Sequence, residues 1–172
     1  MKIIEGLKQT KDLAKKLDDL RRKINLNCVR MDYETPMYGD NQSTQVREWI
    51  QAYGDIVKKT LELRLAIQKT NLTVNVTIEL DGVQVTKSIA AWIHRRKDLA
   101  KLEKMCWDAL SDRNLKEGSI RLTNGEMRDV KIVRHYDPVQ RDNKVSLFDS
   151  EPSLIDAKLE IVNAVTDLIL EE

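Results

Sequence analysis

The first part of the chain carries two apolar stripes with helical spacing. In residues 1–27 an apolar residue recurs every three or four positions, at Leu13, Leu17, Leu20 and Ile24. A longer stripe follows from Ser43, at Val46, Trp49, Tyr53, Ile56, Thr60, Leu63 and Ile67. Alternating steps of three and four residues predict long helices that pack in a coiled-coil manner. We therefore expect residues 1–71 to form an antiparallel helical hairpin, with a loop around Pro36 and Gly39.

The hydrophobic period changes after residue 71. Apolar and polar residues alternate from Leu72 to Leu80 and Asp81-Gly82 supplies a turn, which together predict a β-hairpin over 72–86. Helical spacing returns over 87–114, with an expected apolar face at Ile89, Trp92, Ile93, Leu99, Leu102, Cys106 and Leu110. A second β-hairpin is expected over 119–134, around the turn residues Asn124-Gly125.

The last part of the chain predicts one more long helix. Asp137 is a good cap and Pro138 suits the first helical position. The apolar stripe then runs through Val145, Phe148, Pro152, Ile155, Leu159, Val162, Thr166 and Ile169. Because this spacing continues across the proline, we predict a single helix over 138–170 that is kinked at Pro152. The alternative is a new helix that begins at this proline.

These elements predict a mainly α fold with two small β-hairpins (α+β), in which residues 1–172 form one bundle-like domain. A helical hairpin of two helices of about 25 residues each, roughly 37 Å long, cannot bury both apolar stripes by itself. Other helices or other copies must cover them, and a symmetric homo-oligomer is the simplest source of such copies.

Composition and charge exclude several classes of protein. The 172 residues are 33% charged with a net charge of only +1, which argues against a nucleic-acid binder. No run reaches the roughly 18 apolar residues that a membrane span needs, and the charged N-terminal stretch is no secretory signal. We expect a cytoplasmic protein in which Cys28 and Cys106 are free thiols, with Cys106 in the core.

Motifs for catalysis are missing from the sequence. The chain has two histidines and contains no HExxH, CxxC, Walker loop or GxSxG motif. We therefore expect neither an enzyme nor a metal or other cofactor.

Two cationic clusters are candidates for binding. In the first, Arg95 and Arg96 follow Trp92, and Arg96 lies four residues after Trp92 on the apolar side of the helix. A cation turned toward the interior requires an anionic partner. This partner is either an acidic residue of another helix or a phosphate or carboxylate ligand.

The second cluster consists of Arg134, His135, Tyr136 and Arg141, where the last helix is expected to begin. A helix N-terminus favours anions, guanidinium groups bind phosphate with two donors, and the tyrosine ring could stack on a base. The pattern is typical of half of a nucleotide pocket that a neighbouring subunit completes. The alternative is a capped helix start with ordinary surface charges.

Three stretches together resemble a known family. They are Ile155–Leu168, Arg95–Leu99, and Ile67–Thr73 followed by Asp81-Gly82. In this combination the chain is similar, over nearly its whole length, to the septicolysin-like family of small bacterial and phage proteins. Ala164 stands where the family has an aromatic residue. The toxin activity that the family name implies is not transferred, because the sequence holds no means of attacking a membrane.

The sequence thus favours a non-enzymatic homo-oligomer that binds and sequesters a small anionic, nucleotide-type ligand. By analogy, such a protein could be a phage anti-defence protein that captures cyclic-nucleotide immune signals in the host cytoplasm. The predicted ligand-binding residues are Trp92, Arg95, Arg96, Arg134, His135, Tyr136 and Arg141. The alternative function is structural assembly through helix-mediated oligomerisation alone.

Overall fold

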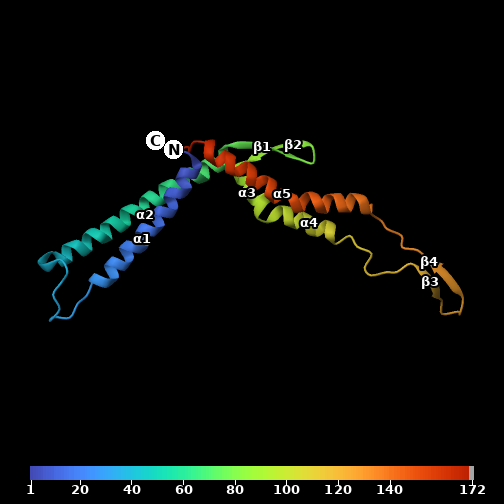
Figure 1. The fold of residues 1–172 in the computed structure, drawn as a ribbon, viewed down its shortest axis with the longest axis horizontal. Coiled ribbons are helices and arrows are strands. Elements are labelled where there is room, and N and C mark those ends of the chain that lie inside the picture. The colour runs from blue at the N-terminus through green and yellow to red at the C-terminus, as the bar shows by residue number, and fades with distance from the viewer. Residues whose placement is uncertain (171–172) are drawn as a thin grey trace. The chain divides into compact units, whose positions relative to one another are not determined.

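A computed structural model describes residues 1–170 of the chain as a mainly helical α+β fold, which confirms the predicted fold class (Figure 1). In chain order the elements are α1 (Ile3–Asn27), the short 3-10 helix η1 (Gly39–Asn41), α2 (Gln42–Thr73), β1 (Asn75–Leu80), β2 (Val83–Ser88), α3 (Ile89–His94), the π-helical turn η2 (Arg95–Leu99), α4 (Ala100–Asp108), β3 (Gly118–Arg121), β4 (Met127–Val130) and α5 (Pro138–Val165). The strands form two separate antiparallel pairs, β1 with β2 and β3 with β4.

The chain divides into two compact units. The first comprises Met1–Val76, Ser88–Ala90 and the chain from Leu159 on, and the second comprises Thr77–Lys87 and Ala91–Lys158. The first unit therefore contains α1 and α2, and the second contains α4, β3 and β4.

In the first unit, α1 and α2 form the predicted antiparallel hairpin. At the loop end, the Gln42 side-chain amide donates a hydrogen bond of 2.9 Å to the Asn27 carbonyl. At the other end Gly6 is buried, and a Cβ atom there would lie only 2.7 Å from Cδ1 of Leu168. A glycine at position 6 therefore lets the chain end pack closely against α1.

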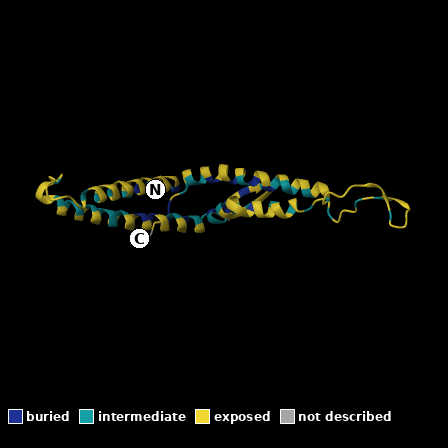
Figure 2. Cartoon of the chain, turned by 90° about the horizontal axis from the view of Figure 1, so that it is seen from below, coloured by how far each residue is buried: buried dark blue, intermediate teal, exposed yellow. Residues whose placement is uncertain are grey.

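The predicted stripe of α2 lies on its covered side. None of its seven positions is exposed, and Thr60 and Leu63 are buried. In Figure 2 the hairpin helices accordingly carry buried and half-buried residues on one side and exposed residues elsewhere. The alternating period of three and four residues in the sequence thus identifies the contact face of this helix correctly.

The two ends of the chain are joined to each other by backbone hydrogen bonds. The Ile3 amide donates to the Thr166 carbonyl at 3.0 Å, and the Leu168 amide donates to the Met1 carbonyl at 2.8 Å. Figure 1 places the N and C labels side by side. The expected end of the last helix at residue 170 is therefore wrong: α5 ends at Val165, because the following backbone pairs with the N-terminus instead.

The first β-hairpin has the predicted turn and a later start than expected. Asp81 and Gly82 have φ angles of +53° and +73°, which suit the left-handed turn that matches the twist of two strands. The first strand begins at Asn75 rather than Leu72, because α2 continues through Thr73.

The helix expected over 87–114 is shorter than predicted and contains a π-helical turn. It runs from Ile89 to Asp108, with the π-helical turn at Arg95–Leu99 between α3 and α4. Such a turn holds one extra residue, so the face of the helix beyond it is shifted by one position.

Part of the predicted apolar face is wrong. Leu99, Leu102 and Cys106 are exposed, whereas Ala100 is buried and Trp107 is half-buried. Counted as a regular helix from the buried Ile89, Leu102 and Cys106 already lie about 140° and 100° around the helix, so the predicted face was drawn too wide. The prediction that Cys106 is a core residue is wrong for this reason.

The remaining elements of this unit follow the predictions more closely. The pair β3 and β4 is in register from Gly118 with Val130 to Arg121 with Met127. It is shorter than the hairpin expected over 119–134. Helix α5 passes through Pro152 without a break, which confirms one helix rather than two at this point.

Candidate functional site

Three predicted binding residues meet at one hollow in the second unit. Arg134, Tyr136 and Arg141 line a surface hollow of about 520 Å³ beside the first turns of α5. The other lining residues are Leu110, Ser111, Asp112, Pro138 and Asp142. The volume is in the range of small-molecule sites.

The carboxylate of Asp112 contacts two other side chains that line this hollow. Arg134 donates from Nε and Nη2 to its two oxygens at 2.7 and 2.6 Å, and the Tyr136 hydroxyl lies 3.4 Å from Oδ1. The two parallel bonds are the fork geometry that guanidinium groups form with carboxylates and phosphates. The Arg134 guanidinium lowers the pKa of the Asp112 carboxyl below its usual value. Asp112 therefore engages two donors of the Arg134 guanidinium within its own chain.

A left-handed turn and the second β-hairpin hold Asp112 in this place. Arg113 and Asn114 have φ angles of +51° and +61°, and the Leu115 amide donates to the Asp112 carbonyl at 2.9 Å. The register of β3 with β4, continued outward, brings Asp112 opposite Tyr136. Asp112 is not among the residues predicted from the sequence, although this continuation of the hairpin register could have found it.

Arg141 is the second cation of the hollow. Its Nη1 donates to Asp142 at 2.7 Å and its Nη2 lies 3.5 Å from Asp108, and these carboxylates raise the pKa of the guanidinium. Its Nε atom is buried and has no hydrogen-bond partner. A buried donor without an acceptor is uncommon in folded proteins.

The start of α5 is capped as predicted. The Asp137 side chain accepts a hydrogen bond of 2.9 Å from the Val139 amide. His135 is exposed and does not line the hollow, so the structure does not bring it together with Arg134 and Tyr136.

Trp92, Arg95 and Arg96 lie in a different cluster, away from this hollow. Trp92 is fully buried, and the Lys87 ammonium lies 5.8 Å from the centre of its ring. With no exposed surface, the indole serves as a core residue.

Arg95 is bound by two carboxylates. Its Nη1 donates to Glu103 at 2.6 Å and its Nη2 to Glu151 at 2.9 Å, while Nε also contacts Glu151. The guanidinium also lies 5.6 Å from the ring centre of Phe148. These contacts raise the pKa of Arg95 and lower that of Glu103. The Glu151 side chain is 1% exposed, so this is a buried ion pair between distant helical segments.

Arg96 donates to Asp156 of α5 at 2.5 Å. Of the two partners that the sequence allowed, an acidic residue of another helix is the one present. The cations Arg95 and Arg96 are thus engaged with acidic residues of their own chain.

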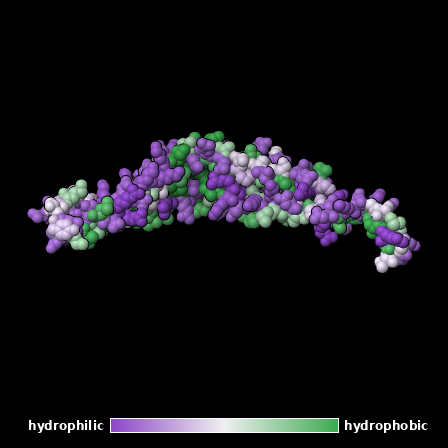
Figure 3. Space-filling model, turned by 60° about the horizontal axis from the view of Figure 1, so that its bottom comes forward, coloured by the Kyte–Doolittle hydropathy of each residue, from purple (hydrophilic) through white to green (hydrophobic). Residues whose placement is uncertain are grey.

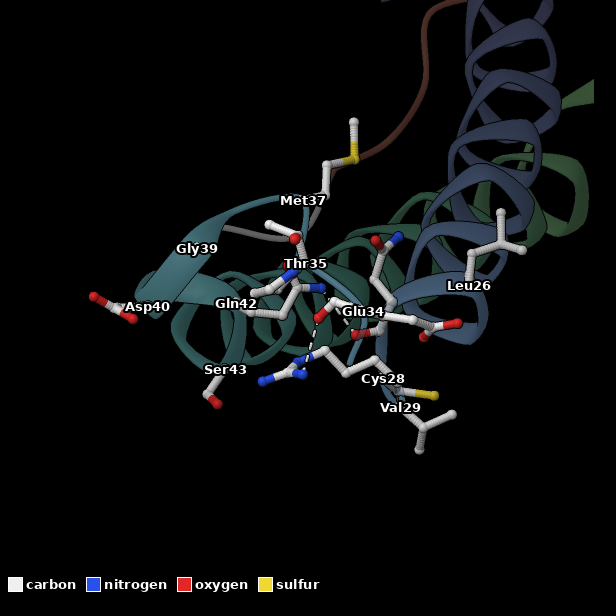
Figure 4. A pocket seen from close by; sticks show the side chains of 13 residues that line it. Leu26, Cys28, Val29, Glu34, Thr35, Met37, Gly39, Asp40, Gln42 and Ser43 are labelled. Carbon is white, nitrogen blue, oxygen red and sulfur yellow. Dashed lines mark hydrogen bonds between the residues drawn. The ribbon is translucent and has the colours of Figure 1, made fainter. Parts of the chain in front are cut away.

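A second hollow belongs to the loop between α1 and α2. It measures about 750 Å³ and is lined by residues between Leu26 and Ser43 (Figure 4). Nη1 of Arg30 donates to the carbonyls of Met31, Asp32 and Glu34. The Arg30 guanidinium thus binds the backbone of its own loop.

Two other kinds of site are absent from the described part of the chain. Residues 1–170 contain no cluster of histidine, cysteine and acidic side chains able to hold a metal ion. Within the same range, no helix combines the length and apolar character of a membrane span.

Comparisons with protein-family models, with curated proteins and with solved structures gave no match. The resemblance to the septicolysin-like family therefore stays a prediction.

Proposed function

We propose that this chain is a non-enzymatic subunit of a homo-oligomer that binds a small anionic, nucleotide-type ligand in the hollow of Arg134, Tyr136 and Arg141. The observation that supports binding is the convergence of these three side chains, predicted from sequence, on one hollow. Two guanidinium groups and a phenol provide donors for phosphate and a ring for a base.

The proposal of an oligomer rests on uncovered apolar surface. Many large apolar side chains are exposed, and on the face drawn in Figure 3 apolar residues interrupt the hydrophilic surface. Surface of this kind is typical of a subunit that other copies cover.

A ligand would have to replace Asp112 on Arg134. The Asp112 carboxylate already accepts hydrogen bonds from Nε and Nη2 of Arg134. The binding free energy of a phosphate is therefore only the difference between the arginine–phosphate and the arginine–carboxylate interactions. The Asp112→Asn variant should therefore bind the ligand more tightly than the wild-type chain, because a neutral amide competes less well for the guanidinium.

Thermal-shift and calorimetric titrations with cyclic di- and trinucleotides and ADP-ribose test this proposal. A ligand at 100 times its dissociation constant adds about 2.7 kcal/mol, which is roughly 5–10 °C in melting temperature for a chain of this size. Arg134→Ala and Arg141→Ala should abolish the shift. Arg96→Ala is the matched control, since Arg96 is also half-exposed and ion-paired but lies outside the hollow.

The second candidate function is assembly alone. It is favoured by the fact that both guanidinium groups of the hollow already have carboxylate partners. If no nucleotide shifts the melting temperature of either the wild-type chain or Asp112→Asn, the binding proposal fails. Structural assembly through oligomerisation is then the function that the structure favours.

A further inference from the structure

Helix α2 carries a second apolar stripe that is exposed. It consists of Ile50, Val57, Leu61, Leu65 and Leu72, whose exposed fractions lie between 45% and 61%. At 100° per residue these positions fall within about 80° of one another, and their centre lies roughly 110° around the helix from the centre of the covered stripe. The helix therefore has two apolar faces, and the single chain covers one of them.

The exposed stripe is palindromic about Leu61. Ile50 and Leu72 lie at equal distances on either side of it in the sequence, and so do Val57 and Leu65. In an interface with twofold symmetry, a residue that contacts another is contacted by that same residue of the second copy. Two α2 helices laid antiparallel across Leu61 thus place apolar side chains opposite apolar side chains along about 33 Å.

The charges beside the stripe complement each other in the same arrangement. Asp55, Lys58, Glu62 and Lys69 follow one edge of it. In the antiparallel pair, Lys58 lies about 3 Å along the axis from the position directly opposite Glu62 of the second copy, within reach of its long side chain. This contact occurs twice because of the twofold symmetry, and the two lysines surround the two Glu62 carboxylates near the symmetry centre. Opposite charges that flank a helix pair fix its orientation, so the charge pattern supports a second copy of this chain as the occupant.

A hollow beside Ile50 provides room for a side chain of the second copy. It measures about 310 Å³ and is lined by Arg21, Ile24, Asn25, Ile50 and Tyr53. In the antiparallel pair the side chain opposite this place is Leu72 of the second copy. A leucine that enters an apolar hollow buries more surface than one on a flat helix.

We propose that α2 forms a twofold, antiparallel interface with α2 of a second copy, centred on Leu61. The inference rests on the proposed homo-oligomer and identifies one of its contact surfaces. It uses only residues of the first unit and is independent of ligand binding at the hollow of the second unit.

Sedimentation velocity of three forms of the full chain tests the interface. The wild-type chain should sediment at no less than twice its 19.9 kDa mass. Leu61→Asp should reduce that mass to half or less, because it places two carboxylates at the symmetry centre. Leu102→Asp is the matched control, since Leu102 is 56% exposed and Leu61 58%, yet it lies outside the stripe. Circular dichroism reports whether each variant is folded.

Cross-linking provides a second test that does not depend on a destabilising charge. With Cys28→Ser and Cys106→Ser as the background, Leu61→Cys should form a disulfide-linked dimer on mild oxidation, and Leu102→Cys should not. A charge swap tests whether the two helices are antiparallel. Lys58→Glu should raise the dissociation constant of the dimer at least tenfold, and adding Glu62→Lys to the same chain should restore it.

The outcomes separate the two proposals. A wild-type chain that sediments at 19.9 kDa overturns both the oligomer and this interface. An oligomer that keeps its mass with Leu61→Asp, and shows no cross-link with Leu61→Cys, overturns the interface but leaves the oligomer. If Leu61→Asp is unfolded, the cross-link decides.

Discussion

At the scale of single residues, Glu151 is a carboxylate that is buried in an ion pair. Its side chain is 1% exposed and is bound to Arg95, which also holds Glu103. Desolvation of a buried ion pair offsets much of its attraction, so removing one partner costs more than the pair contributes. Lys104 and Asp149 form a comparable contact at 2.6 Å on the surface, where water screens both charges.

Glu151→Ala should therefore lower the free energy of unfolding by about 3 kcal/mol, at the lower end for buried pairs because Arg95 keeps Glu103. Denaturant titration measures the change. Asp149→Ala, the control on the same helix, should change the free energy much less. Equal losses in the two variants would contradict the distinction between buried and exposed pairs.

At the scale of elements, the π-helical turn at Arg95–Leu99 sets the angular position of α4. In α4, Ala100 is buried and Trp107 is half-buried, while Leu102 and Cys106 are exposed. A helix repeats every 3.6 residues, so adding or removing one residue rotates everything beyond it by about 100°. The π-helical turn can absorb a deletion because it holds one extra residue, whereas a deletion in regular helix should move Trp107 off the covered side.

Deletion of Lys97 should convert the π-helical turn to regular α-helix and keep Ala100 and Trp107 on the covered side, with little change in melting temperature. Deletion of Lys101, one turn later in regular helix, should rotate Trp107 outward and cost about 2 kcal/mol or more. Thermal unfolding followed by circular dichroism compares the two deletions. The explanation fails if the Lys97 deletion is as damaging as the Lys101 deletion.

At the scale of the whole molecule, paired carboxylates link stability to pH. Arg95 lowers the pKa of Glu103, Arg134 that of Asp112, and Lys2 that of Asp167. A carboxyl with a lower pKa in the folded chain binds protons more readily when unfolded. Its contribution is complete above the usual carboxyl pKa and is lost as pH falls through the folded value.

The free energy of unfolding should accordingly be nearly constant from about pH 7 to 5 and fall below about pH 4.5. Urea titrations at a series of pH values measure this profile. The triple variant Glu103→Gln, Asp112→Asn, Asp167→Asn should have a lower free energy of unfolding at neutral pH. Below about pH 4.5 its free energy of unfolding should fall less steeply than that of the wild-type chain. Two parallel profiles would show that other groups control the acid response.

The sequence by itself determined the elements and much of their faces. Stripes such as Leu13–Ile24, the alternation before Asp81, and the Asp137-Pro138 cap are local patterns, since a helix or strand repeats over neighbouring residues. They placed the helical hairpin, both β-hairpins and a helix that continues through Pro152.

Only the tertiary structure decided which charges meet and which apolar faces are covered. Arg95 and Glu151 are 56 residues apart, Asp112 reaches Arg134 across a hairpin, and α5 stops at Val165 because the N-terminus pairs with the next residues. Such contacts depend on how distant segments close on one another, which no local period encodes. The covered face of α4 also depends on tertiary packing. Residues 99–110 contain apolar side chains on two sides of a helix, and the packing of the chain determines which side is covered.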